Sequence, residues 1–143
     1  MRTLFLNNTL HRVTDANIQF YGSPFMHPKR KIAQHDFIYM LEGEWKIGQD
    51  DEEFRIQKGD VLILAANHSH YGIKPCASGT KTMYIHTSYN TGDEYNKYTD
   101  DKKIILRSHI QVISNPNVKN CFENIEKQLN DEKSTSIFFV FVV

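Results

Sequence analysis

The sequence predicts an all-β fold, a barrel of short strands, followed by one short helix near the carboxyl end. From residue 13 to residue 85, short apolar or alternating runs are separated by turn signals at roughly ten-residue spacing, which is typical of a β-sandwich or barrel. No helical period occurs there, whereas residues 115–129 carry one. A chain of 143 residues is long enough for one domain with one core.

Each expected strand is bounded by glycine, proline or polar turn residues. The strands are predicted at residues 17–20, 37–41, 44–47, 53–56, 61–64, 71–74 and 81–87. The breaks between them are predicted at residues 22–24, 42–43, 48–51, 58–60 and 75–79. Because these breaks are short, consecutive hairpins are the expected connections.

The most regular part of this pattern runs from Gln57 to His70. Gly59 can adopt the positive φ that a tight reversal needs, and the Asp60 carboxylate can accept hydrogen bonds from turn amides. The apolar run 61–64 can therefore begin at once as a buried strand. Two histidines follow it, so we expect a functional site near His70, at the barrel mouth.

The carboxyl-terminal third of the chain changes character. Residues 89–101 are polar and predict a surface excursion or linker, and residues 104–113 predict one more strand. Asn115-Pro116 is typical of a helix start. Four apolar residues then recur at helical spacing: Val118, Phe122, Ile125 and Leu129. This stripe could pack on the barrel or pair with a second subunit.

Composition excludes several function classes. Lys plus Arg equals Asp plus Glu at 17 each, so the chain lacks the basic field of a nucleic-acid binder. The two cysteines, 45 positions apart, are expected to be reduced rather than to form a disulfide or a zinc site. No apolar run reaches the length of a membrane span, so a cytoplasmic protein is expected.

Histidines supply most of the candidate chemistry. Three of them, His35, His70 and His86, lie at strand ends or within strands, where a barrel cavity could collect them. Thr82, Tyr84 and His86 share one face of their strand, and this polar face could point into a cavity or to solvent. The others are assigned to loops, surface or packing: His11, His27, His68 and His109.

Two blocks of the sequence carry a family resemblance. HDFIYMLEGEW, starting at His35, and KGDVLIL, which is followed by HSHYG, resemble the amino-terminal, effector-binding cupin domain of AraC-type transcriptional regulators. The resemblance covers residues 13–129. It implies a double-stranded β-helix barrel (a jelly roll), then helices that dimerise, then a DNA-binding domain with two helix-turn-helix units. That last domain is outside this sequence, so DNA contact is expected only through it.

The resemblance also divides the chain. It implies an amino-terminal arm at residues 1–12, a cupin barrel at residues 13–114 and a helical dimerisation segment at residues 115–143. The arm is expected to cover a bound effector, with His11 and Arg12 near the mouth. Residues 137–143 are wholly apolar and resemble the start of a further helix, so we expect that this segment is cut short.

As a regulator domain, the protein is expected to bind a sugar or another small metabolite and to form a homodimer. Aromatic side chains would stack on the ligand, and polar ones would bond its hydroxyl or carboxylate groups. No cofactor is expected in this case. The predicted pocket residues are His35, Asp36, Tyr39, Trp45, His70, Tyr84 and His86.

A stand-alone cupin metal enzyme, an isomerase or oxygenase, is the alternative. Such enzymes hold a divalent metal through three histidines and a carboxylate. His70 matches the third histidine, but Lys29-Arg30-Lys31 stands where the paired histidines should fall. Any metal would therefore be held by His70 with His35, Asp36 or His86.

Overall fold

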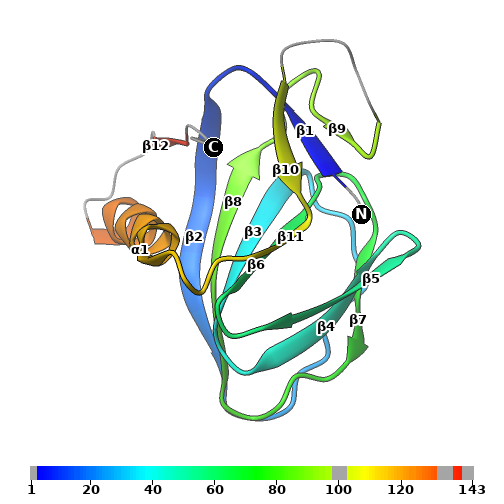
Figure 1. Cartoon of the computed structure of the whole chain (residues 1–143), viewed down its shortest axis with the longest axis vertical. Coiled ribbons are helices and arrows are strands. Elements are labelled where there is room, and N and C mark those ends of the chain that lie inside the picture. Colours follow the sequence, from blue (N-terminus) through cyan, green and yellow to red (C-terminus); the bar gives the residue numbers. More distant parts are fainter. Residues whose placement is uncertain (1–2, 98–102, 132–136, 140–143) are drawn as a thin grey trace.

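The fold is a jelly-roll barrel with one helix, which confirms the predicted fold class. The computed structural model describes residues 3–97, 103–131 and 137–139. A six-stranded sheet, ordered β11-β6-β3-β8-β2-β12, faces a three-stranded sheet, β5-β4-β7, and a third sheet, β10-β1-β9, lies at one end (Figure 1). The elements are β1 (Thr3–Asn7), β2 (His11–Tyr21), β3 (Gln34–Glu42), β4 (Glu44–Gln49), β5 (Glu52–Gln57), β6 (Asp60–Leu64), β7 (His70–Lys74), β8 (Thr80–Ser88), β9 (Glu94–Tyr95), β10 (Lys103–Arg107), β11 (His109–Gln111), α1 (Pro116–Asp131) and β12 (Ile137–Phe139).

The seven predicted strands all form, and most extend beyond their predicted bounds. The largest extension is β2, which begins at His11 rather than at residue 17. Its first half alternates poorly in polarity because a β-bulge between Val13 and Asp15 shifts the register against β8. That irregularity hid the start of the strand from the sequence pattern.

The large sheet separates two apolar cores. Side chains such as Ile38, Trp45 and Leu62 fill the barrel between the two facing sheets. On the other face, Phe37 and Met83 pack with residues of β1 and α1. Strands β3 and β8 are therefore buried on both faces, and the sheet divides the molecule into a barrel side and a helix side.

The turn before β6 has the predicted geometry. Gly59 has a φ of +88°, and the Gln57 amide donates to Asp60 Oδ2 at 3.0 Å. The same carboxylate oxygen lies 2.8 Å from His109 Nε2, so this histidine has a packing role. A β carbon at position 59 would lie 2.4 Å from Ile113 Cβ, which leaves room only for glycine.

The helix stripe packs on the barrel's own outer core. Phe122 and Ile125 are buried, and Val118 and Leu129 pack against the same cluster. Asn130 Nδ2 also donates to the Ala16 carbonyl of β2 at 2.8 Å. Packing within the chain therefore uses the stripe that could also have paired with a second subunit.

Three predicted segments differ from the structure. The single strand expected at residues 104–113 is two strands in different sheets, β10 and β11, and the segment at residues 89–101 contains β9 and the buried Asp93. Residues 137–139 form a strand paired with β2, so a helix there is wrong. Residues 132–136 and 140–143 lie outside the described residues.

The amino-terminal segment is part of the fold. Strand β1 pairs with β10 and β9, and its Leu4 and Leu6 side chains are buried in the outer core. The expected position of His11 at the barrel mouth is wrong, because its side chain points into that outer side. Among the described residues, no helix is long and apolar enough to cross a membrane.

Substitutions at the turn glycines 59 and 79 distinguish the cost of backbone strain from the cost of a steric clash. Both have a φ of +88°, but a β carbon at Gly79 meets nothing within 4 Å. Gly79→Ala should lower the free energy of unfolding by about 1 kcal/mol and Gly59→Ala by about 2 to 4 kcal/mol, measured by urea denaturation. Equal losses in the two variants would contradict the close contact with Ile113.

Phe122 tests how the helix is attached. Because Phe122 is 5% exposed, Phe122→Ala should lower the free energy of unfolding by about 3 to 5 kcal/mol. The control Lys119→Ala, on a half-exposed side chain of the same helix, should change it by less than about 0.5 kcal/mol. A loss at Phe122 no larger than that of the control would show that the helix does not pack on the sheet.

Candidate functional site

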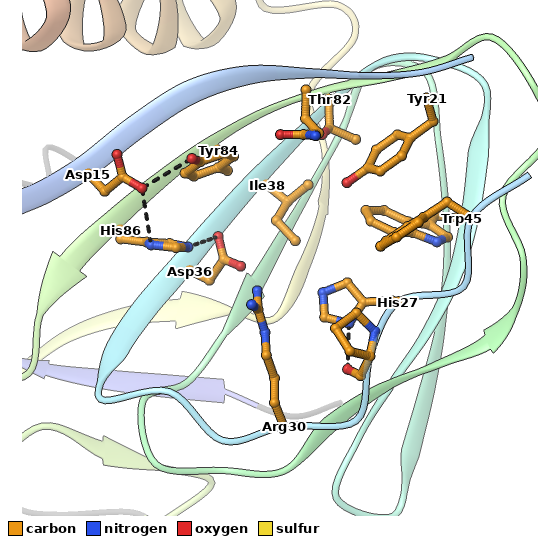
Figure 2. Close-up of a pocket in the computed structure, with 13 residues that line it drawn as sticks. Asp15, Tyr21, His27, Arg30, Asp36, Ile38, Trp45, Thr82, Tyr84 and His86 are labelled. Carbon is orange, nitrogen blue, oxygen red and sulfur yellow. Dashed lines mark hydrogen bonds and ion pairs between the residues drawn. The ribbon is translucent and has the colours of Figure 1, made fainter. Parts of the chain in front are cut away.

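The barrel interior contains a cavity of about 350 Å³ that opens between the two facing sheets (Figure 2). Polar and aromatic side chains from β2, β3, β4 and β8, and from the connection after β2, line it. They are Asp15, Gln19, Tyr21, Phe25, His27, Pro28, Arg30, Asp36, Ile38, Trp45, Thr82, Tyr84 and His86.

Strand alternation brings the polar residues to this cavity. Successive side chains of a strand point to opposite faces, so Thr82, Tyr84 and His86 face the barrel, while Met83 and Ile85 face the outer core. The structure thus resolves the alternative that the sequence left open: the polar face of β8 is the cavity face. On β3 the same alternation places Asp36 and Ile38 on the cavity face.

A row of paired polar groups crosses the cavity wall. The Tyr84 hydroxyl donates to Asp15 Oδ2 at 3.1 Å, and the two imidazole nitrogens of His86 lie 3.9 Å from that oxygen and 3.4 Å from Asp36 Oδ1. Figure 2 shows the dashed contacts that connect Tyr84, Asp15, His86 and Asp36 in this order. Burial by itself lowers the pKa of His86, but the two carboxylates, Asp36 above all, raise it overall. His86 therefore keeps its positive charge to higher pH than a histidine in water.

Aromatic rings form the opposite wall. Trp45 is 3% exposed, and its ring centre lies 5.3 Å from that of Tyr21 and 5.2 Å from that of His27. Tyr21 also stacks on Phe25 at 4.9 Å. Burial raises the pKa of Tyr21 to about 12, so its hydroxyl stays protonated. Trp45 thus serves both as core and as cavity wall.

His27, Arg30 and His70 meet at one end of this wall. The His27 and His70 rings pack edge to face at 5.1 Å, and Arg30 Nε donates to His70 Nε2 at 3.2 Å. Burial, followed by the neighbouring His27, lowers the pKa of His70 to about 4, and burial also lowers that of His27. His70 is therefore neutral, with its proton on Nδ1, for which the described residues offer no hydrogen-bond partner.

The structure gathers most, but not all, of the predicted pocket residues. Asp36, Trp45, Tyr84 and His86 line the cavity, and His70 lies next to it behind Arg30 and His27.

His35 and Tyr39 are not brought to this cavity, because they occupy the alternate positions of β3. Tyr39 packs on Phe122 of the helix, with ring centres 5.6 Å apart. His35 Nε2 lies 2.9 Å from Asp93 Oδ2, on the outer side. His35 therefore cannot share a metal or a ligand with His70.

Several cavity residues were not identified from the sequence. Asp15 follows the bulge, which interrupts the alternation of β2. Arg30 lies in a run of three cations, a pattern that is typical of a solvated segment. His27 lies in an irregular connection with no periodic pattern. No sequence pattern marks Arg30: an isolated bridge pairs its backbone with that of His70, and such pairing is visible only in three dimensions.

A second polar cluster lies on the other face of β3. His11, His35 and Asp93 are buried, and their ligating atoms all lie within 4.8 Å of one another. An open cavity of about 350 Å³, lined by His35, Asp93, Tyr89 and others, reaches this cluster from outside. His11 was assigned to surface or packing, and Asp93 to a surface loop, so the sequence did not predict this cluster.

The lining of the barrel cavity combines charged, neutral polar and aromatic groups. It presents two carboxylates, two cations and several neutral donors and acceptors across from an aromatic wall. The donor set does not fit a divalent metal well, because the Nε2 lone pair of His70 is taken by Arg30, and the guanidinium charge repels a cation. Hydrogen bonding and stacking are what this geometry offers.

One curated relative matches part of the chain. It is the uncharacterized HTH-type transcriptional regulator YisR of Bacillus subtilis, which is 28% identical over 60 residues. The match covers 42% of this chain and 21% of the relative, so the matched segment spans about a fifth of that protein's length.

Solved structures of cupin proteins are also similar. Oxalate decarboxylase from Bacillus subtilis matches at 12% identity and a TM-score of 0.43, over 90% of this chain and 33% of the enzyme. A cupin protein from Bacteroides fragilis matches at 23% identity and a TM-score of 0.33, over 61% of this chain and 73% of its own.

The family match covers most of the domain. The family model of the AraC-like ligand binding domain matches residues 22–139, which include the barrel from the end of β2 onward, the helix and β12. This span contains most of the side chains that line the barrel cavity. The chain belongs to the family of AraC-like ligand-binding domains.

Proposed function

We propose that this chain is the effector-sensing domain of an AraC-type transcription regulator and that its barrel cavity binds a small polyhydroxylated metabolite such as a sugar. One observation carries the proposal: the row Asp15, His86 and Asp36 faces the aromatic wall around Trp45 across a cavity of about 350 Å³. A cavity of this size can hold a small metabolite.

The charges in the cavity favour an uncharged ligand. Asp15 and Asp36 are opposed by Arg30 and by a His86 whose pKa is raised, so the lining carries a balanced set of charges. A net charge on the ligand would leave one of these groups without compensation in a partly buried site. Carboxylates accept hydrogen bonds from hydroxyl groups, and the face of Trp45 can cover the apolar side of a sugar ring.

Sensing requires that the ligand binds one arrangement of the domain better than another. The same strands, β2 and β8, carry the cavity on one face and contact α1 on the other. A ligand that displaces β2 or β8 would bias the position of the helix. We assign DNA recognition to a separate helix-turn-helix domain of the regulator, which acts in the cytoplasm.

The proposal includes a homodimer, as in the regulators that the sequence resembles. Because Phe122 and Ile125 face the sheet, a dimer contact on α1 would use the opposite face of the helix. Sedimentation analysis with and without ligand tests this part, and a strictly monomeric chain under both conditions would remove it from the proposal.

A panel of monosaccharides and polyols tests the main proposal. At a ligand concentration of a hundred times the Kd, binding should raise the melting temperature by about 5 to 10 °C. Asp15→Asn should weaken binding about tenfold, because the Tyr84 and ligand hydroxyls lose a charged acceptor.

Glu44→Gln provides the control for this panel. Glu44 pairs with Arg55 on the surface, outside the cavity, so its substitution should leave the affinity unchanged. A panel in which no compound changes the melting temperature would count against sensing. Equal weakening in both variants would show that the ligand binds elsewhere.

Metal analysis separates this proposal from the enzyme alternative. Protein purified without chelators should contain no stoichiometric divalent metal, because Arg30 lies against His70 and His35 faces the other side of the sheet. Elemental analysis of the native protein measures this. A stoichiometric metal that is lost in His70→Gln would overturn the sensor proposal in favour of a metal enzyme.

A further inference from the structure

The cluster of His11, Asp93 and His35 joins three parts of the chain that are distant in sequence. His11 is the first residue of β2, His35 lies near the start of β3, and Asp93 lies in the segment between β8 and β9. It lies on the face of β3 opposite the barrel cavity: His35 belongs to the cluster and the next residue, Asp36, to the cavity. The cluster is therefore separate from the barrel cavity.

Asp93 is the centre of the cluster. Its Oδ2 atom lies 2.8 Å from His11 Nε2 and 2.9 Å from His35 Nε2, and it accepts a hydrogen bond from the Asn90 amide at 2.9 Å. Its Oδ1 atom accepts from the Asn7 amide at 2.7 Å. The side chains of His11 and Asp93 are 0% exposed, and that of His35 is 2% exposed. The buried carboxylate of Asp93 thus accepts hydrogen bonds from four donors.

The partners of each nitrogen determine where the protons are. His11 Nδ1 lies 3.0 Å from the Thr9 carbonyl oxygen, which can only accept, so this nitrogen carries a proton. Its Nε2 faces a carboxylate oxygen and carries a second proton, which makes His11 an imidazolium. His35 Nδ1 accepts from the Ala66 amide at 3.0 Å, so His35 is neutral and donates through Nε2. The cluster as a whole is uncharged.

The carboxyl group of Asp93 is not itself protonated. Burial raises the pKa of a carboxyl group, but the hydrogen bonds from His11 and His35, helped by those from Asn90 and Asn7, bring the pKa of Asp93 far below its usual range. Asp93 is therefore ionised, and a buried carboxylate of this kind needs the positive charge of His11.

A metal ion suits the same atoms less well. Metal ligation would need bare lone pairs on both Nε2 atoms, and the proton of His35 would have to move to Nδ1. A proton on Nδ1 would face the N–H of Ala66, so two hydrogen-bond donors would be in contact with no acceptor between them. The hydrogen-bond pattern therefore fits protons at the positions that a metal would take.

We propose that His11, Asp93 and His35 form a proton-held latch that fastens the amino-terminal strands to the barrel and opens when His11 loses its second proton. Bonds around the latch support this role. Asn90 Nδ2 donates to the Leu10 carbonyl at 3.0 Å, and Asn7 Nδ2 donates to the Thr91 carbonyl at 2.7 Å. Opening would release the corner between β1 and β2 from the segment after β8.

The sign of the pH dependence follows from the charges. A deprotonated His11 would turn a bare Nε2 lone pair toward the Asp93 carboxylate, which is repulsive, so the latch weakens as the pH rises. Asp93, with its lowered pKa, loses its charge only in strong acid, so it stays ionised as the pH rises. The nearby titratable and charged groups are Tyr89, whose ring contacts His35, and Lys103, which donates to the Gly92 carbonyl. His68, Glu94 and Lys97 line the adjoining cavity.

Nitrogen-15 spectra of the histidine side chains test the proton assignment directly in the unmodified protein. At mildly acidic pH, both nitrogens of His11 should be protonated, while His35 should be neutral with its proton on Nε2. A neutral His11 throughout the titration would overturn the proposal. So would loss of the His11 and His35 proton signals on addition of one equivalent of zinc, because that would identify the cluster as a metal site.

Hydrogen exchange tests the opening of the latch. The protection factor of the Asn7 amide should fall about tenfold at rising pH, once His11 has lost its second proton, because its charged acceptor is released. The Ala65 amide, which donates to Gln49 Oε1 at 2.6 Å, is the internal control and should keep its protection factor. A parallel fall at both amides would indicate general unfolding and overturn the proposal.

Variants complete the test. Asp93→Asn keeps the shape of the side chain and removes its charge, so the protection factor of Asn7 should become low and independent of pH. His68→Phe removes a histidine that pairs with Asp50 at 2.7 Å on the surface, and it should leave the wild-type pH dependence intact. Loss of the pH dependence in His68→Phe, or its retention in Asp93→Asn, would overturn the latch.

Discussion

The burial of β3 and β8 on both faces is the constraint on which the rest of the structure depends. Side chains of a strand alternate between faces, so neighbouring residues on these strands serve different environments. Asp36 faces the barrel cavity and His35 faces the latch, although they are adjacent in the chain. A one-residue shift in register would exchange the two and would place charged groups in the apolar cores.

Charge compensation explains why two polar clusters are tolerated in a small domain. In the cavity, the imidazole of His86 lies between Asp15 and Asp36, and in the outer cluster Asp93 lies between His11 and His35. A buried charge without a partner would destabilise the fold by several kcal/mol, so each cluster is assembled with opposite charges in contact. They lie on opposite faces of β3, and each borders a cavity of about 350 Å³.

The helix α1 packs on the face of the large sheet opposite the barrel cavity. Because α1 packs on the same strands that carry the cavity residues, the sheet physically connects the barrel cavity to the helix. The contact is mostly apolar, with Phe122 and Ile125 buried against the sheet and one hydrogen bond from Asn130 to β2.

The sequence by itself determined the local structure of this protein. Turn chemistry and alternation predicted the central strands, the tight turn at Gly59 and the helix stripe, since these depend on residues close together in the chain. It also identified four of the cavity residues, among them Asp36 and Trp45. Tertiary structure decided which face of each strand points inward, and so it excluded His35 and Tyr39 from the cavity. It alone joined His11 to Asp93 across 82 positions, because long-range pairing leaves no periodic signal in a single sequence.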